Sequence, residues 1–295
     1  MHSSNTLDNF EKGHDYLVCI DSDGCVFDNM ELKHKECFCP ATINCWDLQA
    51  VSRFAREAAE FVNLYSRTRG MNRYPALIRT LELLGQRESA VRRGYKTPDL
   101  EPLKKWISEA PVLSISSLQE YIKTNNDPVL LRTVRWSKEV DENIGRIVRN
   151  VPPLPYVRES LMKMKEYADI VIVSATPHDA IVREWTEHGL IELVNVVAGQ
   201  EHGTKKACIA AANKDNRYGK SKVLMIGDAP GDYEAAKSNG VRFYPIIPGK
   251  EEHSWERLFN EVFDLFRNDE YGDEAESVYI DEFFDVLPVD PPWKS

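Results

Sequence analysis

The sequence predicts a doubly wound α/β fold, in which a parallel sheet carries helices on both faces, together with a separate all-helical cap domain. One apolar run, Tyr16–Ile20, precedes a long block that shows only helical spacing. After residue 150, short apolar runs alternate with amphipathic stretches. Strands that alternate with helices indicate βαβ units and a Rossmann-like parallel sheet. The length of 295 residues also agrees with about two domains.

Five apolar runs are the expected strands of the α/β core. Tyr16–Ile20 ends abruptly in a polar turn, which is typical of a buried strand. The other four runs are residues 169–173, 194–198, 223–226 and 241–246. An apolar stripe over residues 251–267 predicts a helix that closes the core. We therefore expect a discontinuous core made of residues 1–35 and 151–268.

The helical cap is expected over residues 36–150. Apolar residues recur at three- and four-residue spacing from Leu48 to Tyr65, behind Asp47 as a candidate N-cap. Further helices are expected to begin at Tyr74, at Pro98 behind Thr97, at Leu118 behind a Ser117…Glu120 capping box, and at Pro128 behind Asp127. Prolines at 152, 153 and 155 mark the return to the core.

The charge is unevenly distributed along the chain. The net charge is −10, which disfavours non-specific binding to nucleic acid or to an anionic membrane. Nine acidic residues and no basic ones lie between Asp269 and Asp290. This acidic C-terminal extension, residues 269–295, also carries Tyr279, Ile280, Phe283 and Phe284, so we expect it to dock on the core. The oligomeric state is left open.

The cysteines and the polar N-terminus bear on the compartment. The first fifteen residues lack a basic start followed by an apolar stretch, and no apolar run is long enough to span a membrane. We expect a cytoplasmic protein with reduced thiols. Cys37, Cys39 and Cys45 with His34 could ligate zinc, but their spacing is not a paired C-x-x-C framework, and free thiols are the simpler interpretation.

Asp21-Ser22-Asp23-Gly24 follows the first strand. Two carboxylates this close repel each other, so a bound metal or two different chemical roles are expected. A calcium loop is excluded, because Gly24 directly follows the second acid and an apolar strand precedes the first. A solvated turn without function is the remaining alternative for this motif taken alone.

Three further polar motifs stand at strand ends or helix starts. Ser174-Ala175-Thr176 follows the second expected strand, where backbone N–H groups and hydroxyls can hold a phosphate. Lys205-Lys206 opens a helix, where an anionic ligand would offset the repulsion between lysine and the helix dipole. Asp228 and Asp232 follow the fourth strand, and their spacing lets both face one crevice. For Lys205-Lys206, the alternative interpretation is two surface lysines without a ligand.

Together, the four motifs resemble those of the haloacid dehalogenase superfamily, over about residues 15–35 and 152–248. The resemblance implies that Asp21 attacks phosphorus and that Asp23 is the general acid and base. It also implies that Ser174, the Ala175 N–H and Lys205 hold the phosphoryl group, with Lys206 as the alternative lysine. Asp21, Asp228, the backbone carbonyl of Asp23, and Asp232 through water would hold Mg²⁺.

The implied activity is hydrolysis of a small phosphate monoester through an aspartyl-phosphate, because members without an acid at the position of Asp23 cleave other bonds. A phosphomutase is the alternative enzyme, and a catalytically silent scaffold is the alternative of another class. A helical cap inserted after the first motif suits a small phosphorylated metabolite. Four cap residues are candidate substrate contacts or a solvated basic turn: Asn63, Arg67, Arg69 and Arg73.

Overall fold

The computed structural model describes residues 6–294 and divides into two compact units. The α/β unit comprises residues 1–28 and 151–287. The helical unit comprises residues 29–150 and 288–295. The helical unit thus begins seven residues before the expected position 36. Residues 288–295 of the acidic extension belong to the helical unit, although we expected the whole extension to dock on the core. The reason is that Trp293 packs against Phe61 and Arg87 of the helical unit.

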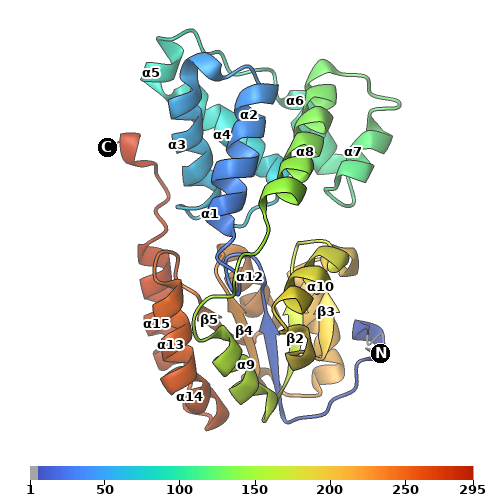
Figure 1. Ribbon diagram of the computed structural model, residues 1–295, viewed down its shortest axis with the longest axis vertical. Helices are drawn as coiled ribbons and strands as arrows, with labels where there is room; N and C mark the ends of the chain where they lie inside the picture. The colour runs from blue at the N-terminus through green and yellow to red at the C-terminus, as the bar shows by residue number, and fades with distance from the viewer. Residues whose placement is uncertain (1–5, 295) are drawn as a thin grey trace. The chain divides into compact units, whose positions relative to one another are not determined.

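The sheet of the α/β unit is parallel throughout, as the sequence predicts, and its strand order is β3-β2-β1-β4-β5 (Figure 1). The strands are β1 Tyr16–Ile20, β2 Ala168–Val173, β3 Val196–Ala198, β4 Val223–Gly227 and β5 Arg242–Pro245. The first strand has the predicted bounds, and the other four differ from them by one or two residues at one end or at both. The chain leaves β1 toward β2 and β3 and later returns to its other side with β4 and β5. The topological switch point, where ligands bind in open α/β sheets, therefore lies at the carboxyl ends of β1 and β4.

Helices cover both faces of this sheet (Figure 1). They are α9 Val157–Lys165, α10 His178–Glu187, α11 Lys205–Ala212, α12 Pro230–Asn239, α13 Glu251–Arg257, α14 Phe263–Arg267 and α15 Asp273–Asp285. A π-helical turn, residues Leu258–Val262, joins α13 to α14. Successive residues of a strand point to opposite faces. Val18 and Ile20 accordingly pack with α9, α10 and α13, whereas Leu17 and Cys19 pack with α11, α12 and α15.

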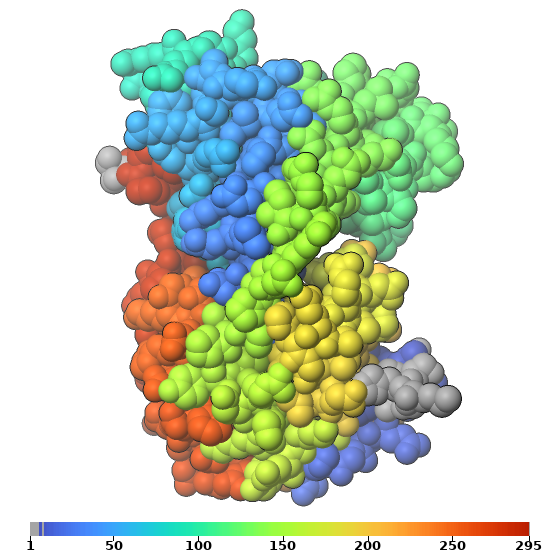
Figure 2. Space-filling model, in the orientation of Figure 1, coloured from blue at the N-terminus to red at the C-terminus, as the bar shows by residue number. Residues whose placement is uncertain are grey.

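The helical unit has its own buried core, which includes Tyr74, Trp106 and Trp136. Its helices are α1 Met30–Leu32, α2 Cys39–Cys45, α3 Ser52–Asn63, α4 Arg73–Gln86, α5 Glu88–Val91, α6 Glu101–Glu109, α7 Ile115–Tyr121 and α8 Pro128–Ile147. A π-helical stretch, Lys33–Phe38, joins α1 to α2. Figure 2 shows α8 in green lying beside the blue residues of α2 and of the π-helical stretch, with both of which it is in contact.

Several helix starts in this unit differ from the sequence prediction. Asp47 does not cap a helix, since its φ of 55° is left-handed and α3 begins at Ser52. Ser114, and not Ser117, accepts the N–H hydrogen bond that opens α7. The helix expected at Pro98 begins at Glu101. Pro128 behind Asp127 was predicted correctly, because the Asp127 carboxylate accepts a hydrogen bond from Val129.

Short 3₁₀ turns connect several of these elements. They are Leu7–Asn9, Gln49–Val51, Ile191–Leu193, Gln200–His202, Lys214–Asn216, Lys220–Lys222 and Pro292–Lys294. Among the helices of residues 6–294, none is long and apolar enough to cross a membrane.

Candidate active site

Asp21 is the first residue beyond β1, and the backbone fixes it at the switch point. Its N–H donates to the carbonyl of Ile226 on β4, at 3.0 Å, which extends the β1–β4 ladder by one residue. Its carboxylate oxygen Oδ1 accepts the N–H of Ser22 at 2.7 Å. The Asp21 side chain is buried. A carboxylate is thus placed at the carboxyl end of a central strand.

The loop after Asp21 is held by two buried tryptophans of the α/β unit. The indole N–H of Trp185, on α10, donates to the Ser22 hydroxyl at 3.0 Å. The indole N–H of Trp255, on α13, donates to the backbone carbonyl of Cys25 at 2.7 Å. Gly24 between them has a φ of 75°, a backbone conformation that glycine adopts without strain. These contacts keep the loop in one conformation, and no sequence motif indicated either tryptophan.

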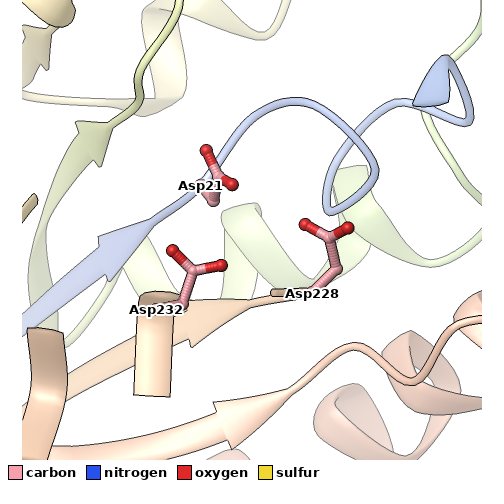
Figure 3. A group of neighbouring side chains, drawn as sticks. All are labelled: Asp21, Asp228 and Asp232. Atoms are coloured by element: carbon pink, nitrogen blue, oxygen red, sulfur yellow. The ribbon is translucent and has the colours of Figure 1, made fainter. Parts of the chain in front are cut away.

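Asp228 and Asp232 bring two more carboxylates to Asp21 (Figure 3). One oxygen of each of the three acids lies within 4.8 Å of the others, and all three residues are buried. Asp228 follows β4, and Asp232 lies in the first turn of α12, where its Oδ2 accepts the N–H of Ala229 at 3.1 Å. A Cβ at Gly227 would lie 2.4 Å from the Asp232 carboxyl carbon, so only glycine fits there. The predicted spacing of four residues therefore does bring both acids to one point.

Lys205 supplies the positive charge of this cluster. Its Nζ lies 2.5 Å from Asp21 Oδ2 and 2.5 Å from Asp232 Oδ1. The lysine is the first residue of α11, behind Thr204, whose hydroxyl caps the helix by accepting the Ala207 N–H. Lys206, one residue later on the helix, is exposed. Of the two lysines that the sequence left open, the structure brings Lys205 to the acids.

The electrostatics of the cluster are those of crowded, buried acids. Burial raises the pKa of Asp21 to about 6; Lys205 opposes this rise and Asp232 adds to it. Burial likewise raises the pKa of Asp232. Burial by itself would lower the pKa of Lys205, but the attraction of Asp21 and Asp232 outweighs it and raises that pKa well above its ordinary value. The lysine is therefore charged at neutral pH.

The acid cluster fits a divalent cation. Three carboxylates face one ammonium group, which leaves an excess of two negative charges in a buried site when all are ionised. Oxygen donors are the ligands that Mg²⁺ prefers, and its charge would offset that excess. Asp23, the fourth acid predicted at this site, is not part of the cluster; its Oδ2 accepts a hydrogen bond from the Thr176 hydroxyl at 2.8 Å.

Ser174, Ala175 and Thr176 form the turn after β2, next to β1 in the sheet. Ser174 is buried, and its N–H donates to the carbonyl of Ala198 on β3 at 3.0 Å. Its hydroxyl accepts the N–H of Thr176 at 3.2 Å. The turn therefore places the Ser174 hydroxyl and the Ala175 backbone N–H at the carboxyl end of β2, beside the strand that Asp21 follows. Thr176 is part of the predicted motif, but the family resemblance assigns it no role of its own.

The four candidate residues of the helical unit are mostly engaged within that unit. The Asn63 amide donates to the carbonyl of Ala59, and the buried Arg69 donates to the carbonyl of Leu64. Arg73 pairs with Asp141 at 2.7 Å and also donates to Ser137 at 3.2 Å. Arg67 is exposed, and its backbone N–H donates to the carbonyl of Pro288.

The cysteine cluster forms no comparable site. All six cysteines of the chain are free thiols and are buried. Within residues 6–294, the acid cluster is the one group of three metal-ligating side chains with ligand atoms within 4.8 Å of one another. Cys45 instead contacts Glu139 and Arg135.

A buried cluster of acids and a lysine, at the switch point of a doubly wound parallel sheet, defines an α/β enzyme. The sequence profile of the haloacid dehalogenase-like hydrolases matches residues 84–246, more than half of the chain. The chain therefore belongs to this family of hydrolases, as the four motifs predict. The matched stretch includes Ser174, Lys205, Asp228 and Asp232, and Asp21 precedes it.

Several solved structures match parts of this chain at low sequence identity. A candidate haloacid dehalogenase-like hydrolase from Bacteroides fragilis is 14% identical, with a TM-score of 0.48 over 81% of this chain and 92% of that one. A predicted phosphoglycolate phosphatase from Haemophilus somnus is 14% identical, with a TM-score of 0.44 over 78% and 84%. A haloacid dehalogenase-like hydrolase from Streptococcus pneumoniae is 12% identical, with a TM-score of 0.44 over 82% and 90%. No curated protein matches the sequence.

Proposed function

We propose that this hydrolase is a Mg²⁺-dependent phosphatase, which cleaves a small phosphate monoester through an aspartyl-phosphate on Asp21. The observation that carries the proposal is the Lys205 ammonium, 2.5 Å from both Asp21 and Asp232. A phosphate dianion repels a carboxylate nucleophile. A fixed ammonium group beside the nucleophile lowers that repulsion without rearrangement during the reaction.

We propose that Asp21, Asp228 and the backbone carbonyl of Asp23 hold Mg²⁺, with Asp232 acting through water. When bound, the cation supplies charge that screens the phosphate and polarises its oxygens. Asp228 and Asp232 lie with Asp21 in one buried cluster, which supports their assignment. In this scheme the attraction of Lys205 favours the ionised forms of Asp21 and Asp232, since it opposes the rise in their pKa values that burial causes.

The chemical steps use the residues of the α/β unit. The Asp21 carboxylate forms a bond to phosphorus while the bond from phosphorus to the ester oxygen breaks. Asp23 gives its proton to that oxygen, so that an alcohol leaves. Asp23 then takes a proton from the water that attacks phosphorus, which releases inorganic phosphate and restores the Asp21 carboxylate. Ser174 and the Ala175 N–H would hold the phosphoryl oxygens throughout.

The substrate we propose is a small phosphorylated metabolite, because a whole helical unit is inserted between Asp28 and Val151. Arg67 is the proposed contact in that unit, since its side chain is exposed whereas Asn63 and Arg69 are buried. The six free thiols agree with a reducing compartment, and we propose the cytoplasm.

Phosphate release from a panel of phosphorylated metabolites, with Mg²⁺ and with a chelator, tests the function. We expect Asp21→Asn to lower the rate by about 10³-fold or more, because the nucleophile is lost. Asp28→Asn, an exposed acid at the end of the same loop, should leave the rate unchanged. Equal rates for wild type and Asp21→Asn would disprove the nucleophile. With a bis-phosphorylated sugar, an isomerised product in place of free phosphate would identify a phosphomutase.

A further inference from the structure

Thr176 connects the loop that carries Asp23 to the turn that carries Ser174. Its hydroxyl donates to Asp23 Oδ2 at 2.8 Å. Its backbone N–H donates to the Ser174 hydroxyl at 3.2 Å, and its carbonyl accepts the N–H of Gln200 at 3.0 Å. The backbone N–H and the carbonyl of Thr176 are thus both hydrogen-bonded, which fixes its backbone. Its side-chain hydroxyl makes the contact with Asp23.

The partner loop is fixed as well. Ser22, immediately before Asp23, accepts the Trp185 indole N–H, and its own carbonyl accepts the N–H groups of Val26 and Phe27 at 2.9 and 3.2 Å. The backbone of Asp23 is therefore held, but a carboxylate can still rotate about its side-chain bonds. The hydrogen bond from the Thr176 hydroxyl to Asp23 Oδ2 restrains that rotation.

We infer that Thr176 is a positioning residue for the proton transfers of Asp23, an inference that rests on the proposed phosphatase function. The hydrogen bond from the threonine hydroxyl holds the Asp23 carboxyl in one orientation. In the first step a proton passes from this carboxyl to the ester oxygen as the bond from that oxygen to phosphorus breaks. In the second step the carboxylate takes a proton from the attacking water as the bond from phosphorus to Asp21 breaks. Thr176 itself exchanges no proton in either step.

The contribution of a positioned acid depends on the leaving group. An alkyl oxygen is a poor leaving group unless it is protonated, whereas p-nitrophenolate leaves without a proton. A loss of Asp23 alignment should therefore slow cleavage of glycerol 2-phosphate and spare the first turnover of p-nitrophenyl phosphate. The later hydrolysis of the aspartyl-phosphate needs Asp23 as a base with both esters. A variant that loses the alignment should accumulate this intermediate when p-nitrophenyl phosphate is the substrate.

The experiment compares the full-length wild type with Thr176→Val and Thr176→Ser, in Mg²⁺, by rapid mixing with each ester. Valine keeps the shape of threonine but cannot donate, and serine keeps the hydroxyl. We expect Thr176→Val to slow the first turnover of glycerol 2-phosphate about 10- to 100-fold, part of the usual contribution of general acid catalysis. Its first turnover of p-nitrophenyl phosphate should stay within about twofold and appear as a burst before slower turnover. Thr176→Ser should restore the wild-type pattern.

Two results would overturn the inference while leaving the phosphatase function intact. One is an equal slowing of both first turnovers in Thr176→Val, which would show a general disturbance of the site. The other is no slowing with either ester. Failure of the proposed function would look different, because wild type would then release no phosphate from either ester, or would match Asp21→Asn, and the role of Thr176 would fall with it.

Discussion

The indole N–H of Trp255 donates to the backbone carbonyl of Cys25 at 2.7 Å, which ties α13 to the loop that begins with Asp21. Both groups are buried. If the donor is removed, the carbonyl stays buried without this partner, which costs about 1–3 kcal/mol. Trp255→Phe should therefore lower the free energy of unfolding by more than the loss expected from the cavity that the smaller side chain leaves. It should also lower the rate of phosphate release, because the loop is less constrained.

Trp106 provides a matched control for this prediction. It is as deeply buried in the helical unit as Trp255 is in the core, but its indole nitrogen has no hydrogen-bond partner among the described residues. Trp106→Phe creates a similar cavity without orphaning an acceptor. Urea denaturation of both variants should show the larger loss for Trp255→Phe, and equal losses would contradict a role for the bond to Cys25.

The stability of the metal-free protein should fall as the pH rises from about 4 to about 6. The pKa of Asp21 is raised to about 6 in the folded chain, chiefly by burial, against about 3.9 in an unfolded one. Between these values the unfolded chain has lost a proton that the folded chain still holds. The contribution of Asp21 to stability is therefore full below about pH 4 and decreases up to about pH 6. Urea denaturation in a chelator, for wild type and Asp21→Asn, measures this contribution as their difference.

Saturating Mg²⁺ should oppose that decrease, because a carboxylate ligand must be deprotonated to bind the cation. The stabilisation by Mg²⁺ should accordingly grow from pH 4.5 to pH 6.5, at about the pH where Asp21 ionises. Asp228→Asn should lose most of the Mg²⁺ effect, since it removes one of the three buried carboxylates of the cluster. A Mg²⁺ stabilisation that is unchanged in Asp228→Asn would rule out this cluster as the binding site.

Asp169 should dominate the opposite, acidic side of the stability profile. Burial tends to raise its pKa, but hydrogen bonds from His14, Tyr218 and Gly13 outweigh burial and hold the pKa below its ordinary value. Its stabilising contribution is present above about pH 4 and is lost as the pH falls through the lower folded pKa. Asp169→Asn should lower the unfolding temperature at pH 6 and flatten its fall below pH 4. The exposed Asp15→Asn is the control and should change neither.

The sequence predicts best where local chemistry is decisive. The strand Tyr16–Ile20 has its predicted bounds because its apolar run ends at a polar turn. The helix α8 begins at Pro128, as predicted, because Asp127 caps it and proline is favoured in the first turn. The helix α2, Cys39–Cys45, was not predicted; it follows directly on the π-helical stretch Lys33–Phe38, which has no α-helical spacing.

Tertiary contacts account for what the sequence could not supply at the site. Neighbouring lysines at a helix start differ by about 100° in direction, and only the folded chain shows that Lys205 reaches Asp21. Trp185 donates a hydrogen bond to Ser22, 163 positions earlier in the chain, and Trp255 donates one to Cys25, 230 positions earlier. No local sequence pattern could therefore predict these contacts. Family membership was nevertheless predictable, because each motif lies at a strand end or a helix start.

The end of the chain should stabilise the helical unit through Trp293. Its ring packs edge-on against Phe61, with centroids 5.7 Å apart, and the Arg87 guanidinium lies 4.5 Å from its centroid. A cation–π contact of this kind is worth about 0.5–2 kcal/mol, and the ring contact adds to it. Trp293→Ala should therefore lower the stability of the helical unit by about 1–2 kcal/mol, measured by hydrogen exchange in α3 and α4. Val289→Ala, at an exposed neighbouring position, should have no effect, and identical exchange in both variants would show that the end of the chain does not stabilise this unit.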